Sequence, residues 1–229
     1  MRNKFLSVAS FFGIIFILSS SLPAVAQVAG PQVFITWKAK SYAPSSFGGK
    51  ILPGSTSPVL ADVQVLDKGR PANLSAMTVY WYLNDRLINR GIGLQSVTFR
   101  APQTLSAGSL SLRVQIPDYP GGIVKSINIP VVQPSVVLES PYPNGTFNSQ
   151  SVSVRALPYF FTVPDLSFLS FSWTVNGSAV QAAENPQSLR VNINQGAAPG
   201  SVLNIKVTVS NPTGYFEGAS DEKNLTFSL

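Results

Sequence analysis

Apolar and polar residues alternate with a period of two through most of the chain after residue 26. Val79, Trp81 and Leu83, for example, alternate with Tyr80 and Tyr82. A period of two is the pattern of a strand that buries one face. No long segment after residue 26 has the 3.6-residue period of a helix, and the chain holds 17 Gly and 18 Pro, which favour turns. The pattern therefore predicts an all-β fold.

The alternating pattern occurs twice, in three blocks that keep the same order. The block 79–85, which contains Trp81, matches the block 171–177, which contains Trp173, 92 residues later. Three matched blocks in one order predict two copies of one structural module. The other two pairs of blocks are 95–99 with 187–191 and 106–116 with 198–209. In the last pair the spacing grows from 92 to 93 residues.

Turn-forming residues end each tryptophan strand. Asn84 and Asp85 follow the first, and Asn176 and Gly177 follow the second. These residue types tolerate positive φ, so each pair predicts a tight turn. With the flanking alternating segments, each half has six or seven strands at the spacing of a sandwich. We expect the two units to meet at residues 132–134, a junction too short for a flexible linker, which predicts a semi-rigid rod.

The tryptophan strand has a sequence motif of its own, apolar-x-Trp-x-apolar-Asn followed by Gly or Asp, at 79–85 and 171–177. A later alternating strand in each half ends at a turn. At these residues the chain resembles bacterial immunoglobulin-like and PKD-like surface domains, over both halves. The resemblance implies a β-sandwich fold and a cell-surface setting, and it implies no ligand.

The first 26 residues have the pattern of a secretory signal peptide. Arg2 and Lys4 precede an apolar run over 5–18, and Ala24-Val25-Ala26 supply the small residues of a cleavage site. The run is shorter than the roughly 20 residues of a spanning helix. We therefore expect cleavage after Ala26 and an extracellular, periplasmic or cell-surface protein, with an uncleaved N-terminal anchor as the alternative.

The full prediction is an all-β chain of two tandem immunoglobulin-like β-sandwiches after an N-terminal signal peptide helix. Its parts are the signal peptide 1–26, the first sandwich 27–133 and the second sandwich 134–229. Both Trp81 and Trp173 lie on the apolar faces of their strands, so we expect them in the cores of the sandwiches.

Several kinds of chemistry are excluded by composition. The chain has no His and no Cys, so Ser-His-Asp sites, Cys-His sites, disulfides and thiolate chemistry are impossible. Secreted immunoglobulin domains of animal type usually carry a disulfide, so its absence favours a bacterial exported protein. We predict no enzyme and no cofactor; a carboxylate-dependent hydrolase is the weakest hypothesis, because most carboxylates lie in or beside turns.

Among metal ions, calcium is the one that the sequence favours most. Asp85 and Asp118 lie in turns, and Asp221 and Glu222 precede the last strand. Surface modules bind Ca²⁺ with several oxygen ligands at loop ends. The chain has no D-x-D run and no EF-hand loop, however, so we assign no metal site and expect these carboxylates to serve the backbone.

Aromatic and basic side chains of the first half are the candidates for partner binding. Residues 31–133 hold ten Lys and Arg against four Asp and Glu, whereas residues 134–229 hold four against six. An excess of cations favours anionic wall polymers or acidic partners, and the alternative is an ordinary solvated surface that prevents sheet pairing. The aromatic candidates for one exposed patch, unless neighbouring strands cover them, are Trp37, Tyr42, Tyr80, Tyr82 and Tyr119. The basic candidates are Lys38, Lys40, Arg86 and Arg90.

These observations favour an exported, non-catalytic interaction module. The expected partner is an envelope protein or an anionic glycan or wall polymer; nucleic acid is not expected without a clustered basic stripe. Membrane contact would arise through an uncleaved signal segment or through a partner. The alternative is a structural subunit of an extracellular assembly, in which edge strands pair between copies.

Overall fold

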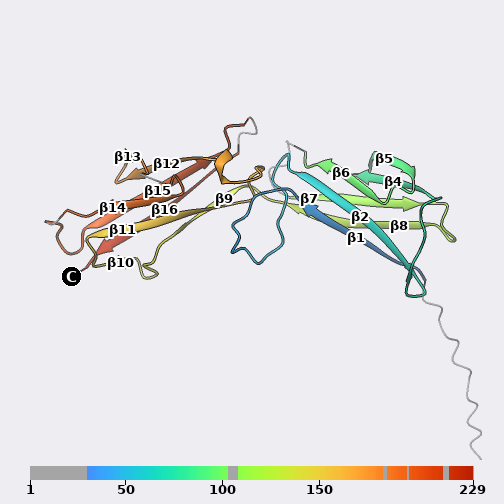
Figure 1. Ribbon diagram of the computed structural model, residues 1–229, viewed down its shortest axis with the longest axis horizontal. Coiled ribbons are helices and arrows are strands. Elements are labelled where there is room, and N and C mark those ends of the chain that lie inside the picture. The colour runs from blue at the N-terminus through green and yellow to red at the C-terminus, as the bar shows by residue number, and fades with distance from the viewer. Residues whose placement is uncertain (1–29, 103–107, 183–184, 195, 214–216, 229) are drawn as a thin grey trace, which may run out of the picture. The chain divides into compact units, whose positions relative to one another are not determined.

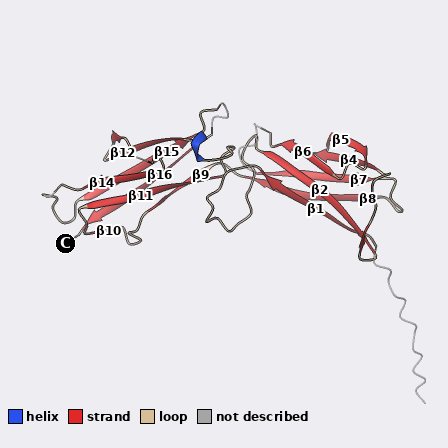
Figure 2. Ribbon diagram, in the orientation of Figure 1, coloured by secondary structure: helices blue, strands red, loops and turns tan. Residues whose placement is uncertain are grey.

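The computed structural model describes residues 30–102, 108–182, 185–194, 196–213 and 217–228 (Figure 1). The described chain consists of β-strands and one short 3₁₀ helix, η1 (Leu166–Phe168), so the all-β prediction is confirmed (Figure 2). The predicted signal peptide 1–26 lies outside the described residues. No helix in the described ranges is long and apolar enough to cross a membrane. Residues Pro31–Leu229 belong to one compact unit.

Strands β1 to β8 form two antiparallel sheets, which we call the first sandwich. In one sheet, β2 pairs with β1 on one side and with β3 and β6 on the other. These strands are β1 (Gln32–Ala39), β2 (Pro58–Asp67), β3 (Arg70–Pro71) and β6 (Ser96–Arg100). The other sheet has the order β5-β4-β7-β8. Its strands are β4 (Thr78–Leu83), β5 (Arg86–Ile92), β7 (Gly108–Ile116) and β8 (Ile123–Val131).

Strands β9 to β16 form two further sheets, which we call the second sandwich. The smaller sheet has the order β14-β11-β9. Its strands are β9 (Ser135–Glu139), β11 (Ser151–Tyr159) and β14 (Ser188–Asn192). The larger has the order β10-β16-β15-β12-β13, with β10 parallel to β16. Its strands are β10 (Thr146–Phe147), β12 (Ser170–Val175), β13 (Ser178–Val180), β15 (Val202–Ser210) and β16 (Gly218–Phe227).

The strand order of both sandwiches is immunoglobulin-like. In each, the first, second and fifth long strands share one sheet, and the third, sixth and seventh share the other. This is the arrangement of the A-B-E and C-F-G sheets of an immunoglobulin sandwich, with an added strand beside C. Whether each sandwich is an independent domain, with the boundary between residues 133 and 134, stays a prediction.

Each sandwich encloses a hydrophobic core around its tryptophan. Trp81 is 0% exposed and Trp173 is 2% exposed, so their prediction as core residues is confirmed. The indole N–H of Trp81 donates to the carbonyl of Leu94 at 3.0 Å, and that of Trp173 donates to the carbonyl of Pro186 at 2.8 Å. Each tryptophan therefore buries its ring and still pairs its one polar group.

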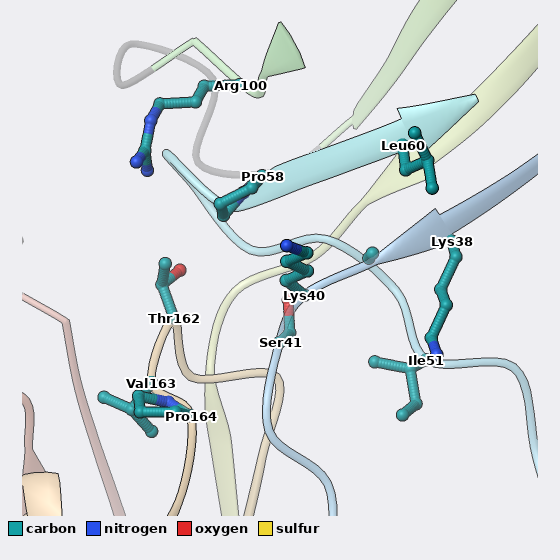
Figure 3. A pocket seen from close by; sticks show the side chains of 11 residues that line it. Lys38, Lys40, Ser41, Ile51, Pro58, Leu60, Arg100, Thr162, Val163 and Pro164 are labelled. Atoms are coloured by element: carbon teal, nitrogen blue, oxygen red, sulfur yellow. The ribbon is translucent and has the colours of Figure 1, made fainter. Parts of the chain in front are cut away.

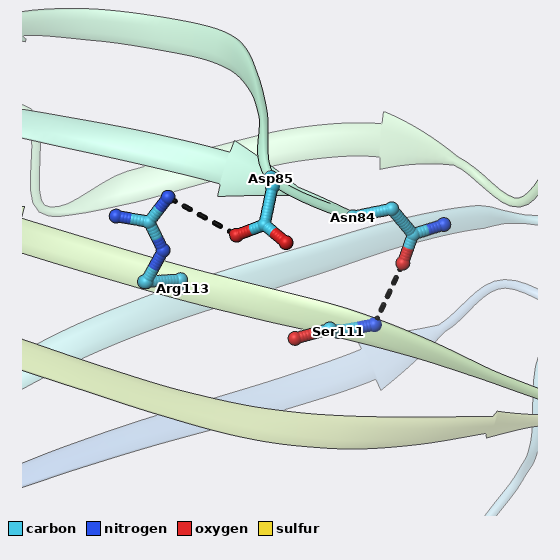
Figure 4. Close-up of polar contacts among 4 residues, drawn as sticks. All are labelled: Asn84, Asp85, Ser111 and Arg113. Carbon is cyan, nitrogen blue, oxygen red and sulfur yellow. Dashed lines mark hydrogen bonds and ion pairs between the residues drawn. The ribbon is translucent and has the colours of Figure 1, made fainter.

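The turns that end the tryptophan strands also bind the next strand of the sheet. Asn84 and Asp85 have φ of 47° and 62°, the left-handed pair of a tight hairpin. The side-chain oxygen of Asn84 accepts the N–H of Ser111 at 2.9 Å (Figure 4). In the second sandwich, the side-chain oxygen of Asn176 accepts the N–H of Asn204 at 2.8 Å. The repeat of 92 residues thus reflects a repeated set of contacts.

Replacing either core tryptophan should unfold mainly its own sandwich. Trp81→Ala leaves a cavity in the first core, and truncating a buried Trp costs about 3–5 kcal/mol. Scanning calorimetry should show the transition of the first sandwich at a lower temperature, with the second little changed, and Trp173→Ala should do the reverse. Unchanged melting in both variants would contradict the assignment of these residues to the cores.

Candidate functional site

A buried network of polar side chains joins the two sandwiches. Glu217 is 5% exposed, and its carboxyl oxygens accept the backbone N–H of Thr162 at 2.8 Å and its hydroxyl at 2.6 Å. The side-chain amide of Asn211 donates a third hydrogen bond at 3.1 Å. The Thr162 hydroxyl also lies 2.8 Å from the hydroxyl of Ser57, which lies 2.9 Å from that of Ser41. We call these five residues the junction network.

The Thr162 hydroxyl is the centre of the junction network. Its oxygen lies 2.6 Å from a carboxyl oxygen of Glu217 and 3.2 Å from the carbonyl oxygen of Ser55, both of which can accept its proton. A hydroxyl has one proton to donate, so when Thr162 donates to either acceptor, Ser57 donates to Thr162. The Ser57 hydroxyl also accepts the N–H of Gly54 at 3.0 Å. Hydrogen bonds in such a chain polarise one another and are strengthened by burial. Two segments about a hundred residues apart in the sequence are therefore held against one buried carboxyl group.

Backbone and aromatic contacts reinforce this junction. Tyr42 donates its N–H to the carbonyl of Phe161 at 2.8 Å and accepts the N–H of Phe160 at 2.6 Å. The ring of Phe47 packs edge-on against Tyr159 and Phe160, with centroid distances of 5.6 and 5.7 Å. Gly54 approaches so closely that a Cβ there would lie 2.7 Å from the carbonyl oxygen of Phe160. The packing leaves no room for a larger residue.

Two residues at the junction have a strained backbone. Thr56 and Phe160 have φ of 66° and 62°, a region that branched and bulky residues rarely adopt. The other non-glycine residues with positive φ in the described chain lie in hairpin turns: Lys68, Asn84, Asp85 and Asn176. Among the described residues, the buried side-chain oxygen without a hydrogen-bond partner is Oγ1 of Thr56. Backbone strain of this kind concentrates at functional sites.

A groove of about 640 Å³ opens beside the junction network (Figure 3), and we call it the junction groove. Pairing of β1, β2 and β6 places Lys38 opposite Leu60 and Arg100 opposite Pro58, on the outer face of their sheet. The 162–164 segment of the second sandwich forms another wall. The lining residues are Lys38, Ala39, Lys40, Ser41, Ile51, Pro58, Leu60, Arg100, Thr162, Val163 and Pro164.

The junction groove is cationic. Lys38, Lys40 and Arg100 line it, and no Asp or Glu does. In the described chain none of these three side chains has an ion-pair partner; the described ion pair joins Arg113 to Asp85. The Arg100 guanidinium donates to the carbonyl of Thr56 at 3.2 Å, so the strained residue holds one of the cations in place. A volume within about 300–1,000 Å³ and a largely apolar lining with a few polar groups are typical of ligand sites.

The structure divides the predicted binding residues among separate places. Lys38 and Lys40 line the junction groove, and Tyr42 lies at the junction with its pKa raised by burial. Trp37 packs against the first core, with the Lys50 amine 3.9 Å from its ring centroid. Tyr119 is 7% exposed, and burial raises the pKa of its hydroxyl. Tyr119 is therefore buried and does not belong to an exposed aromatic patch, whereas Trp37 is partly buried against the core.

The other predicted residues lie on the β5-β4-β7-β8 sheet. Tyr80 pairs with Arg90 across β4 and β5, and Tyr82 pairs with Arg113 across β4 and β7. Arg86 begins β5 directly after the turn. Arg100 and Thr162 also line the junction groove, and neither is among the binding residues predicted from the sequence. The alternation of block 95–99 was the available signal for Arg100, because it places that residue outward.

The carboxylates considered for calcium mostly bind backbone or neighbouring side chains. Asp118 accepts the N–H of Thr78 at 2.9 Å, and this hydrogen bond holds the pKa of its carboxyl below the usual range. Asp85 lies 3.3 Å from the Arg113 guanidinium (Figure 4), and Asp221 accepts the N–H of Leu138 at 2.7 Å. Over the described ranges, no three His, Cys, Asp or Glu side chains form a group that could hold a metal ion.

Several solved structures have some likeness to this chain. The three N-terminal domains of the outer capsid protein Hoc of bacteriophage RB49 are 16% identical, with a TM-score of 0.43, over 86% of this chain and 59% of that one. Fibronectin(III)-like modules of Clostridium thermocellum CbhA are 15% identical, with a TM-score of 0.29, over 86% and 94%. Bacteroides ovatus SGBP-B, solved with a mixed-linkage heptasaccharide, is 12% identical, with a TM-score of 0.25, over 87% and 48%. No family model and no curated protein matches the chain.

Removing the central hydroxyl of the junction network should destabilise the protein. Thr162→Val keeps the volume of the side chain and deletes the group that links Ser57 to Glu217. A buried polar group that loses its partner costs about 1–3 kcal/mol of unfolding free energy. The matched control, Thr98→Val at an exposed position of β6, should change it by less than about 0.5 kcal/mol. Urea unfolding measures both, and equal effects would contradict the network's role.

Relieving the backbone strain at Thr56 should raise the free energy of unfolding, whereas Thr162→Val should lower it. Thr56→Gly permits positive φ at no steric cost and loses no side-chain hydrogen bond, so we expect stabilisation of about 1 kcal/mol. As a control, Thr36→Gly in the interior of β1 should destabilise by about 0.5–1 kcal/mol. Thermal melting of Thr56→Gly and Thr36→Gly compares their stabilities with that of the parent protein. If both glycines destabilise alike, Thr56 is not strained.

Proposed function

We propose that the chain is an exported, non-catalytic binding module that holds an anionic partner in the junction groove. The partner is an anionic wall polymer or glycan, or an acidic envelope protein. In this proposal residues 1–26 are removed after Ala26, and residues 27–133 and 134–229 are tandem immunoglobulin-like domains. The observation that carries it is the convergence of Lys38, Lys40 and Arg100 on a groove without an acidic residue, walled by both sandwiches.

The setting of these cations suits binding. Lys38 and Arg100 project from paired strands, so their Cα positions are fixed by the sheet. Cations gathered on one face create a potential that attracts anions and raises the association rate. The apolar floor, which includes Ile51, Leu60 and Val163, adds contact area for the uncharged part of a partner. Because strand pairing holds the backbone that carries Lys38 and Arg100, little backbone reorganisation is needed on binding, which lowers its free-energy cost.

A catalytic role has little support from the residues. The sequence contains no His and no Cys, and the groove lining contains no carboxylate that could act as general acid or base. Two of the edge strands also give little support to an assembly built by strand pairing. The edge strand β13 has three residues, and the edge strand β5 carries Arg86 and Arg90. Short and charged edges resist pairing between copies.

Charge reversal in the groove tests the proposal. The variant changes Lys38, Lys40 and Arg100 to Glu; the control reverses the exposed Lys68, Arg70 and Lys125, which lie outside the groove, so both have the same net charge. We expect the groove variant to lose about tenfold or more in affinity for at least one of polygalacturonate, polyphosphate and polyglutamate, measured by calorimetry at about 0.05 M salt. The control should stay within about threefold of the parent.

The three probes separate the possible partners. Preference for polygalacturonate indicates an acidic glycan, preference for polyphosphate a phosphate-bearing polymer, and preference for polyglutamate an acidic protein. Binding should weaken as salt rises to about 0.15 M, because screening shortens the reach of exposed charges. The assignment of the groove would be overturned if the groove variant and the control lost the same affinity for the polyanions. It would also be overturned if neither variant changed that affinity.

A further inference from the structure

A second surface of the first sandwich has the composition of a protein-docking site. It lies on the outer face of the β5-β4-β7-β8 sheet, away from the core. The strand register places Arg90, Tyr80, Gln115 and Val124 in one row across the four strands. The adjacent row holds Leu87, Tyr82, Arg113 and Ser126. We call these two rows, with Ile92 at the end of β5, the tyrosine–arginine face.

Exposed apolar side chains lie at both edges of this face, on β5 and on β8, with Tyr80 and Tyr82 between them. Ile92 is 73% exposed, Val124 is 62% exposed and Leu87 is 43% exposed. They are three of the eight large hydrophobic residues that are exposed in the described chain. Single exposed apolar residues are ordinary, but apolar residues on both sides of aromatic side chains on one sheet face are typical of an interaction site. Tyr and Arg are also the residues most enriched where binding energy concentrates.

The arginine and tyrosine at the centre of the face are already arranged for contact. The guanidinium carbon of Arg113 lies 4.1 Å from the centroid of the Tyr82 ring, and its nitrogen lies 3.3 Å from Asp85. Two contacts fix the Arg113 side chain before any partner arrives, so less conformational entropy is lost on binding. Arg113 also covers one face of the Tyr82 ring, and that face is closed to a stacked sugar.

The second sandwich provides an internal comparison. Ser172 and Thr174 of β12 occupy the places of Tyr80 and Tyr82, and Lys206 occupies the place of Arg113. Thr174 and Lys206 face Glu222 of β16 in the same row. The same sheet therefore forms with serine, threonine and lysine at these positions. Tyrosines and an arginine are not required there by the fold, which points to a role outside it.

We propose that the tyrosine–arginine face docks a protein whose surface carries apolar residues bordered by carboxylates. Arg86, Arg90 and Arg113 give the face a positive charge, and its nearest acid, Asp85, is already paired with Arg113. A second copy placed face to face would bring like charges together, which is unfavourable. The partner is therefore a different protein with acidic groups. This proposal does not depend on a ligand in the junction groove.

Peptide selection tests the proposal. A phage library of random peptides, about twelve residues long, would be panned on residues 27–229. We expect the enriched peptides to combine Asp or Glu with aromatic or aliphatic residues. A synthetic copy of an enriched peptide should bind Tyr82→Ala and Arg90→Glu about tenfold more weakly, equivalent to about 1.4 kcal/mol. The matched changes in the second sandwich, Thr174→Ala and Lys206→Glu, should leave its affinity within about twofold.

Arg90 is exposed, so Arg90→Glu should fold. It therefore tests the inference even if Tyr82→Ala unfolds the protein. Three results would overturn the inference. The first is that enriched peptides bind every variant equally. The second is that neutral oligosaccharides bind and lose affinity with Tyr82→Ala, which makes the face a sugar platform. The third concerns sedimentation: the molecular mass of the parent rises with concentration, and that of Arg90→Glu stays at the monomer value. In that case a second copy of the chain occupies the face.

Discussion

The buried carboxyl group of Glu217 is the constraint on which the functional architecture depends. A buried carboxyl group without hydrogen-bond partners costs several kcal/mol. In this chain Thr162 and Asn211 supply the donors, and Thr162 connects through Ser57 to Ser41 of the first sandwich. These donors lie in the second sandwich, and the hydrogen bond between Thr162 and Ser57 extends the network to the first sandwich and so couples the two. The junction groove follows from that coupling, because its walls come from both.

The two surfaces of the first sandwich differ in the chemistry they offer. The junction groove has an apolar floor and cations that lack ion-pair partners within the described residues, so it suits a mobile anionic chain. On the tyrosine–arginine face, Arg113 lies between Tyr82 and Asp85, beside exposed apolar residues. This face suits a protein partner with apolar and acidic groups. Both surfaces lie where the cationic excess of the sequence is concentrated, in residues 31–133.

Much of the fold could be predicted because its signals are local. The period of two around Trp81 and the turn at Asn84 lie within a few residues of each other, and the same holds for Trp173 and Asn176, 92 residues later. The functional sites could be predicted only in part. Lys38 and Lys40 stood out by charge, but Arg100 and Thr162 reach the groove through pairing between distant segments. Tyr119 was misplaced because a tyrosine in a Pro-Gly-rich turn gives no sign that its ring folds back over the core.

The most direct test of the account is the affinity of Ser57→Ala for polyphosphate or whichever polyanion binds the parent best. Ser57 is 0% exposed and does not line the junction groove, and its replacement leaves Lys38, Lys40 and Arg100 in place. If the junction network positions the groove, affinity should fall about threefold to tenfold in a variant that remains folded. Unchanged affinity, together with reduced stability, would show that the network stabilises the fold without shaping the site.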